Sequence, residues 1–304
     1  MNIAAALRRP EYVLRPSQLM RRIIWKFRPP SAKYLTVRLP WGLPIRVEPC
    51  ETIGSSIGRL GIHELPTTEC IIRLINPGDT TVDAGANIGH MTSVMAVAAG
   101  PAGRVIAFEP HPTIFQELTF NVGAWNRLGN VAKIETRNCA LGESSGNATL
   151  LVPRYFGNNH GVSYLVEDQK AAQDAEFVNV ELGTLDQLVG KDQRIGLLKI
   201  DVEGHELKVL QGAQALLSSG NVRDIVFEEY GAPPTPVTSL LESYRYTLFR
   251  IDGKFSGLVV LPAHEEWELP MKDAPIYVAT LDPDRLQSRL AKKGWAAYSS
   301  KWRS

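Results

Sequence analysis

A regular alternation of short apolar segments and longer helical segments constrains the fold of this chain more than any other feature. Apolar segments of strand length lie at 80–83, 105–108, 132–137, 195–200 and 224–228, and segments with helical character follow at 88–99, 112–127 and 206–217. Further strands are expected at 148–152 and 177–182, and a closing pair at 246–251 and 276–280. This order predicts an α/β fold of Rossmann-like type, with a doubly wound, mostly parallel sheet and a terminal antiparallel hairpin.

The segments around this alternation divide the chain into four parts. Residues 1–33 form a basic N-terminal extension, and 34–77 hold a hairpin and a helix that precede the core. Within that second part, 34–39 and 43–47 alternate around Pro40-Trp41-Gly42, and 64–74 has helical spacing. Residues 78–284 form the α/β domain itself, and 285–304 are expected to be a polar, basic surface helix or frayed tail.

Charge is distributed unevenly along the chain. The 304 residues carry a formal net charge of only +1, which predicts neither nucleic-acid nor membrane binding. Residues 1–46, however, hold ten Lys or Arg against one acid, Glu11, on an otherwise acidic body. Apolar residues recur at helical spacing over 19–27. Two interpretations stay open: a helix that docks on the domain, or a basic amphipathic helix that makes peripheral contact with an anionic membrane.

Three cysteines, Cys50, Cys70 and Cys139, show neither metal-like nor paired spacing, which fits a reducing compartment. No apolar run reaches the roughly 18–20 residues of a membrane span, and no signal peptide is recognisable. The sequence therefore predicts a cytoplasmic protein, with contact at the membrane surface through the basic extension as the alternative.

Two motifs follow the first two strands and predict a cofactor site, because ligands of parallel sheets bind beyond the carboxyl ends of the strands. In Val82-Asp83-Ala84-Gly85-Ala86-Asn87-Ile88-Gly89, Gly85 and Gly89 allow a tight turn, and Asp83 can hold the amino end of an aminoacyl cofactor. Glu109 ends the next strand, 20 residues after Gly89, where an acid can accept both hydroxyls of a ribose.

Polar residues also follow the third strand and the strand at 195–200. Asn138, in Asn138-Cys139-Ala140-Leu141-Gly142, is either an adenine contact or a plain turn residue. Asp201, Glu203, His205 and Glu206 follow the strand at 195–200 within six residues. Clustered carboxylates in a cleft shift one another's pKa values, which suits acid–base chemistry. For Glu206 the favoured explanation is its place at the start of a helix, where an acid interacts well with the helix dipole.

These segments resemble the FkbM family of methyltransferases. The resemblance rests on VDAGANIG (82–89), FEP (108–110), NCALG (138–142) and above all KIDVEGHELKVLQGA (199–213), and it covers about residues 78–230. It implies a class I methyltransferase fold with S-adenosylmethionine as cofactor. The family's pattern maps onto Asp83, Gly85, Asn87, Gly89, Glu109, Asp201, Glu203, Gly204 and Glu206. Asn87 stands where broader methyltransferases often have a second glycine, a departure that the family shares.

The resemblance further implies methyl transfer to oxygen, with a hydroxyl of a small molecule, sugar or glycolipid as acceptor; it does not carry over which acceptor. An alcohol is a weak nucleophile, so a general base is expected. Asp201 is the first candidate, His205 the second, and His160, in an expected lid over 153–166, the third. Mg²⁺ is not favoured, although Asp201, Glu203 and Glu228 have suitable oxygen ligands.

Three other functions compete with this interpretation. An NAD-dependent oxidoreductase would use the same turn and Glu109, but the spaced G-x-G-x-x-G is absent. A nucleic-acid methyltransferase would use the basic extension, but that extension has little aromatic interleaving, so no nucleic-acid partner is expected. A non-catalytic binding protein would not need Asp83, Glu109 and Asp201 together.

Overall fold

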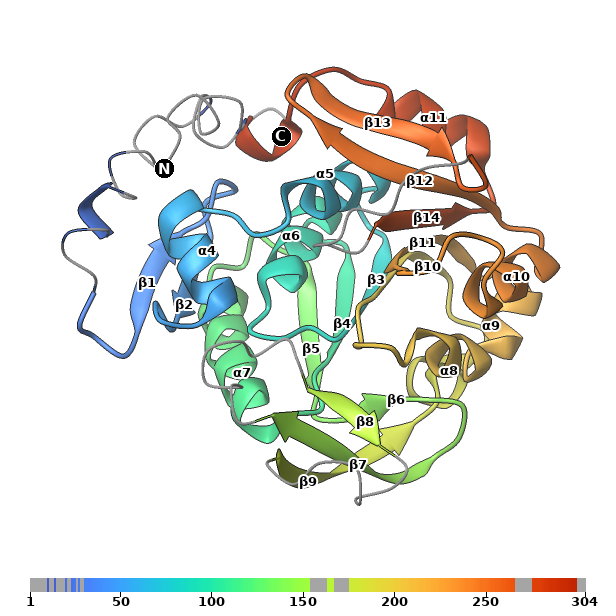
Figure 1. Cartoon of the computed structure of the whole chain (residues 1–304), viewed down its shortest axis with the longest axis horizontal. Coiled ribbons are helices and arrows are strands. Elements are labelled where there is room, and N and C mark those ends of the chain that lie inside the picture. The colour runs from blue at the N-terminus through green and yellow to red at the C-terminus, as the bar shows by residue number, and fades with distance from the viewer. Residues whose placement is uncertain are drawn as a thin grey trace.

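An eight-stranded, mostly parallel sheet forms the centre of the molecule (Figure 1). The computed structural model describes residues 10, 14, 20, 23–25, 27, 30–153, 163–166, 175–265 and 275–299. The strand order is β13-β12-β14-β11-β10-β3-β4-β5, and β11, β10, β3, β4 and β5 run parallel. The strands are β3 (Thr80–Ala84), β4 (Arg104–Phe108), β5 (Lys133–Arg137), β10 (Ile195–Ile200), β11 (Val222–Glu228), β12 (Thr247–Lys254), β13 (Gly257–Pro262) and β14 (Ile276–Thr280).

The predicted α/β fold, with its mostly parallel sheet and antiparallel closing strands, is confirmed. β12 pairs antiparallel with β14, as predicted, and β14 inserts between β12 and β11. β13 extends the sheet by one strand that the sequence reasoning did not predict. The burial pattern explains why the core strands were recognisable: all six residues of β10 are buried, as expected for a parallel strand covered on both faces.

Helices cover both faces of the sheet. They are α6 (His90–Ala99), α7 (Pro112–Asn126), α8 (Glu206–Gln211), α9 (Gln214–Ser218) and α10 (Pro236–Ser243). The single helix predicted over 206–217 is in fact two, because the chain breaks at Gly212. A Cβ at position 212 would lie 2.0 Å from the carbonyl oxygen of Gly142. Because glycine has no Cβ, the turn between the two helices can pack directly against the backbone at Gly142.

The segment before the core holds the predicted hairpin of β1 (Leu35–Arg38) and β2 (Pro44–Val47) and the predicted helix α5 (Leu65–Leu74). It also holds α4 (Thr52–Leu60), which was not predicted. Gly54 and Gly58 lower the helical propensity of α4 and hid it from the sequence reasoning. Both are used for close packing, since a Cβ at Gly58 would lie 2.1 Å from the Trp25 ring.

A second, four-stranded sheet lies beside the central one (Figure 1). Its order is β6-β9-β7-β8, formed by β6 (Ala140–Leu141), β7 (Gly146–Pro153), β8 (Tyr164–Val166) and β9 (Ala175–Gly183). A π-helical turn, η3 (Asp186–Gly190), leads from β9 into β10. Most of the expected lid over 153–166 lies outside the described residues, and so does His160.

The described part of the C-terminal segment begins with a helix, one of the two alternatives expected for 285–304, and packs against the core. Helix α11 (Pro283–Leu290) buries Leu286 and Leu290, and the 3-10 turn η4 (Ala296–Tyr298) follows the buried Trp295. The fully buried Glu69 of α5 accepts the N–H groups of Ala296 and Ala297 at 2.7 and 2.9 Å. Most of residues 1–29 lie outside the description. Within the described part of the chain no helix is long and apolar enough to cross a membrane.

Replacing Glu69 should destabilise the fold strongly. Its carboxylate pairs with Arg73, 2.5 Å away and only 7% exposed, and also holds the C-terminal segment. Glu69→Ala would leave two main-chain donors unpaired and would remove the counter-charge of a buried guanidinium, which would keep only main-chain carbonyls as partners. We expect the free energy of unfolding to fall by about 3–5 kcal/mol in denaturant titrations. The control Glu242→Ala, which breaks an exposed pair with His264, should change it by less than about 1 kcal/mol; similar losses would contradict this role of Glu69.

Candidate active site

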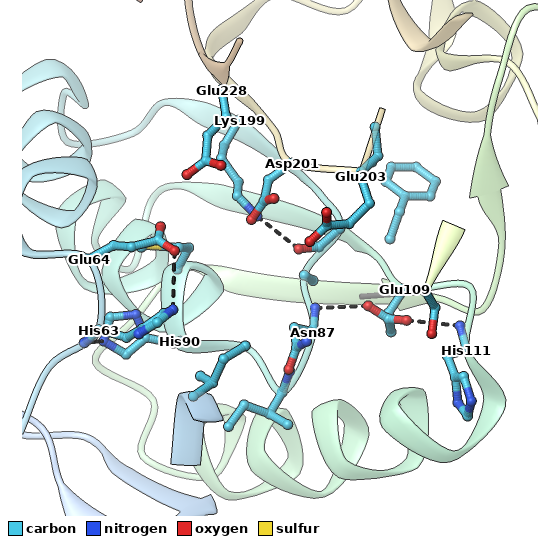
Figure 2. A pocket seen from close by; sticks show the side chains of 18 of the residues that line it. His63, Glu64, Asn87, His90, Glu109, His111, Lys199, Asp201, Glu203 and Glu228 are labelled. Carbon is cyan, nitrogen blue, oxygen red and sulfur yellow. Dashed lines mark hydrogen bonds and ion pairs between the residues drawn. The ribbon is translucent and has the colours of Figure 1, made fainter. Parts of the chain in front are cut away.

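A cavity of about 840 Å³ opens at the carboxyl ends of the parallel strands, within the size range of small-molecule sites. It brings together residues that follow or end four strands: Gly85 after β3, Glu109 after β4, Asp201 after β10, and Glu228 at the end of β11. Figure 2 shows these side chains converging on one space, with Glu109 at one end, His63 and Glu64 at the other, and Asn87 and Asp201 between them.

The glycine turn after β3 is fixed by close backbone approach. Gly85 has φ +78°, and a Cβ there would lie 1.8 Å from the carbonyl oxygen of Asp201, so only glycine fits. The N–H groups of Gly85 and Ala86 donate to the Phe108 carbonyl at 3.1 and 2.9 Å. The turn therefore joins the ends of β3, β4 and β10 into one floor of the cavity. Gly89, at φ +94°, is packed under Leu118 in the same way.

Three lining residues other than glycine adopt left-handed backbone conformations. Glu64, Asn87 and Glu203 have φ values of 47°, 50° and 51°, and Arg245 is the fourth such residue in the described part of the chain. Such conformations cost free energy for a non-glycine residue and cluster at functional sites, where the surrounding structure enforces them. Their concentration around one cavity marks it as the candidate site.

Lys199 is the buried cation of the site, a residue whose role the sequence reasoning missed. Its ammonium is 4% exposed and donates to the Gly85 carbonyl at 2.8 Å. It also lies 3.3 Å from Asp83 Oδ1 and 3.1 Å from Asp201 Oδ2. Burial opposes its charge, but Asp201, Asp83 and Glu64 outweigh burial and raise its pKa. The signal was a lone lysine inside the apolar segment Ile195–Ile200, where a charge needs a buried partner.

Asp83 holds this lysine instead of facing the cavity. It is fully buried, does not line the cavity, and accepts a hydrogen bond from Thr92 Oγ1 at 2.6 Å. A contact of Asp83 with the amino end of a cofactor stays a prediction, and in this structure Asp83 reaches the cavity only through Lys199. Asp201 is the carboxylate that reaches the cavity, with its side chain 35% exposed.

Glu109 faces the cavity at the end of β4 and is 7% exposed. Its two oxygens accept the main-chain N–H groups of Asn87 and His111 at 2.9 and 2.8 Å. Burial raises the pKa of this carboxyl to about 7, although both hydrogen bonds oppose the rise. Each oxygen keeps a lone pair, so the group can still accept two hydroxyls from a ligand.

Asn138 supports the loop that carries Glu109. Its amide nitrogen donates to the carbonyls of Glu109 and Pro110 at 2.8 and 2.9 Å. This pairing leaves the amide oxygen as the atom that can accept from an adenine amine. His205 lines the same side of the cavity, since a Cβ on Gly142 would lie 3.4 Å from its Nε2. His205 is therefore a lining residue, whereas Asn138 acts on the cavity only through the loop that carries Glu109.

Three acids that line the cavity have raised pKa values. Burial raises the pKa of Asp201, and it raises the pKa of Glu203 to about 7 and that of Glu228 to about 9; neighbouring carboxylates add to each rise. These three were the weak alternative for Mg²⁺. Among the residues that the structure describes, no group of three or more His, Cys, Asp or Glu is placed to hold a metal ion.

His63, Glu64 and His90 form a further polar group that the sequence reasoning missed. His63 Nε2 lies 3.1 Å from Glu64 Oε1, and the His63 N–H donates to His90 Nε2 at 3.3 Å. Burial opposes the ionisation of Glu64, but the hydrogen bond and charge of His63 outweigh it and lower its pKa to about 2. His63 and Glu64 precede α5, outside the segments that carried the family resemblance, which is why no motif pointed to them.

The strand order, the glycine turn after β3 and the acid after β4 together define the class I methyltransferase fold. The model of the methyltransferase FkbM domain matches residues 83–254, more than half of the chain. The chain belongs to the FkbM methyltransferase family.

Several characterised relatives and solved structures are similar to this chain. Methyltransferase sdnD of Sordaria araneosa is 35% identical over 43% of this chain, and Methyltransferase 1 of Beauveria bassiana is 32% identical over 43%. The chain spans less than two thirds of these two relatives, 59% and 57% of their lengths. The hexuronic acid methyltransferase AglP of Haloferax volcanii is 32% identical over 59% of this chain and 70% of its own. A crystal structure of methyltransferase FkbM from Methylobacillus flagellatus aligns with TM-score 0.40 and 18% identity, covering 66% of this chain and 43% of that one.

Because the pKa of Glu228 is raised, replacing this residue by glutamine, its neutral isostere, should increase the stability of the fold by an amount that depends on pH. A carboxyl whose pKa is higher in the folded state stabilises the fold below its unfolded pKa of about 4.3 and loses that contribution as pH rises through about 9. Glu228→Gln stays neutral throughout. Its free energy of unfolding relative to wild type should therefore rise between pH 5 and pH 9, by about 1 kcal/mol or more. Denaturant titrations at pH 5, 7 and 9 measure this, and a pH-independent difference would contradict it.

Proposed function

We propose that this protein transfers the methyl group of S-adenosylmethionine to a hydroxyl of a small molecule, sugar or glycolipid. The observation that carries the proposal is the joint placement of Gly85, Glu109 and Asp201 around one cavity, in a chain of the FkbM family. The cofactor supplies a methyl group on a positively charged sulfur, and the protein supplies binding, orientation and charge.

Glu109 is proposed to bind the cofactor's ribose. The main-chain N–H groups of Asn87 and His111 fix the direction of its carboxylate, so its free lone pairs point into the cavity. Hydroxyls that donate to it favour its ionised form, which opposes the effect of burial on its pKa. The Asn138 amide oxygen lies next to the same loop and would accept from the adenine amine.

Asp201 is proposed to bind the cofactor's amino group. The sequence predicted two roles for Asp201, as a cofactor-binding residue and as the general base. Cofactor binding fits better, because Lys199 already holds one of its oxygens at 3.1 Å. Burial raises the pKa of Asp201 and Lys199 opposes this rise only in part, so the ammonium group of a bound cofactor would further stabilise the ionised form of Asp201. With the adenosine held by Glu109 and the amino group held by Asp201, the reactive methyl group would be offered to the remainder of the cavity.

The remainder of the cavity is proposed to take the acceptor. His63, Glu64, Leu65 and Ile276 line it, a mixed polar and apolar wall that suits a hydroxylated organic molecule. The printed names of two relatives describe such acceptors: 31-O-demethyl-FK506 for FkbM of Streptomyces tacrolimicus, 28% identical over 73% of this chain, and hexuronic acid for AglP. Lys199 is engaged by Asp83 and Asp201, and the described lining offers no other lysine or arginine, so we favour uncharged acceptors.

Methyl-labelled S-adenosylmethionine tests the proposal directly. Purified protein is incubated with it and a panel of neutral sugars, hexuronic acids, polyols and macrocyclic alcohols, and label in the acceptor is measured. We expect transfer to a neutral acceptor. Asp201→Asn should raise the KM for S-adenosylmethionine about tenfold or more while Leu60→Ala, also on the cavity wall, leaves that KM within about threefold. Label in no acceptor, together with saturable binding of NAD, would contradict the proposed function.

A further inference from the structure

The pair of His63 and Glu64 lies at the end of the cavity opposite Glu109 (Figure 2). The pair comes from the loop between α4 and α5, an element outside the residues that the family model matches. Glu64 also lines a second, very small cavity of about 10 Å³ together with Lys199, Asp201 and Glu228. His63 and Glu64 are therefore neighbours of the strand ends where, on the proposed function, the methyl group lies.

The imidazole of His63 is oriented by a carboxylate, as in the histidine–carboxylate pairs of hydrolases. Nε2 points at Glu64 Oε1, 3.1 Å away, so the neutral ring carries its proton there and keeps a lone pair on Nδ1. In the described part of the chain Nδ1 has no hydrogen-bond partner, and it is not among the buried unpaired polar atoms. Nδ1 is therefore not sealed in the protein interior, and His63 lines the cavity.

The surrounding backbone holds the pair in place. The left-handed conformation of Glu64, with φ 47°, turns its side chain back onto the preceding histidine. Thr68 anchors both residues: its N–H donates to the Glu64 carbonyl at 2.9 Å, and its hydroxyl donates to the His63 carbonyl at 3.1 Å. The His63 N–H bonds to the buried His90 ring. A strained backbone that several hydrogen bonds hold in place beside a cavity is typical of a functional site and not of a solvated loop.

We infer that His63, oriented by Glu64, is the general base that accepts the proton of the acceptor's hydroxyl. This role rests on the proposed function. As the acceptor oxygen bonds to the methyl carbon, the carbon–sulfur bond breaks and its electron pair stays on sulfur. The hydroxyl proton passes to Nδ1 of His63, and Glu64 stabilises the imidazolium that forms. The proton then leaves to solvent, which restores the neutral ring.

The other base candidates are less well placed. His205 lies beside Gly142, which does not line the cavity, and it follows the same strand as Asp201. Asp201 is bound by Lys199, and His160 lies outside the described residues. His90 is buried, and burial followed by the charge of His63 lowers its pKa to about 3, so it accepts the His63 N–H as a neutral ring. His63, in contrast, lines the cavity and is oriented by a carboxylate 3.1 Å from its Nε2.

The charges around His63 set its working pH. Burial lowers its pKa, but Glu64 on its own loop outweighs burial, and Asp201 and Glu51 add to the effect, so the pKa lies above its ordinary value. The groups facing the pair from other elements are His90 on α6, Lys199 on β10 and Glu228 on β11. Because the base must be unprotonated, kcat/KM should rise with pH through a value above about 6.5.

Steady-state kinetics with methyl-labelled S-adenosylmethionine and the acceptor that the panel identifies test this role. His63→Ala should lower kcat by about 10²–10⁴-fold and leave the Kd for S-adenosylmethionine within about threefold. Added imidazole should restore part of the lost kcat. Glu64→Gln should move the acidic limb of the kcat/KM profile to lower pH, because it removes the charge that raises the pKa of His63. His264→Ala, at an exposed histidine outside the cavity, is the matched control and should match wild type.

If His63→Ala methylates an acceptor with an unchanged kcat, this inference is wrong and the proposed function stays intact.

Titration of the histidine ring protons by NMR tests the pairing of His63 with Glu64 without any acceptor. We expect the pKa of His63 in wild type to exceed both about 6.5 and its value in Glu64→Gln. Equal values in the two proteins would show that Glu64 does not orient and charge His63, and the inference would fail even if no panel acceptor reacted.

Discussion

The buried ammonium of Lys199 is the interaction on which the rest of the site depends. It links the Gly85 carbonyl, Asp83 and Asp201, and so joins the turn after β3 to the end of β10. A buried charge is tolerated only when it is paired, so the cation and the carboxylates require one another. The close approach of Gly85 to the Asp201 carbonyl follows from the same arrangement, since any Cβ would block it.

This arrangement also sets the electrostatics of the cavity. Lys199 is shared between two carboxylates, Asp83 and Asp201, and it compensates the other acids of the cavity less. Burial accordingly raises the pKa values of Asp201, Glu203 and Glu228. The pair of His63 and Glu64 differs from them, because the hydrogen bond and charge of His63 lower the pKa of Glu64 to about 2, whereas burial raises the pKa values of the neighbouring acids. The cavity thus has an end that binds through carboxylates and an end that can accept a proton, with the strand ends between them.

The sequence predicted those parts of the molecule whose signals are local. Apolar strands such as 195–200, the glycine turn at 85–89 and the acid at 109 have residue patterns that follow from chain geometry, and the structure contains all of them. Helix α4 was missed because its two glycines serve tertiary packing. The burial of Asp83 and the linking role of Lys199 depend on contacts between strands that no local pattern reports. His63 and Glu64 were missed for the same reason, since only folding brings their loop to the end of β10.

A crystal structure of the protein with S-adenosylhomocysteine, the stable product of the proposed reaction, tests the central claim most directly. The account predicts that the ribose hydroxyls lie within hydrogen-bond distance of Glu109, that the amino group lies at Asp201, and that the sulfur faces the space bounded by His63 and Glu64. A ligand bound with its ribose away from Glu109, or with its sulfur directed toward His205 and away from His63, would contradict it.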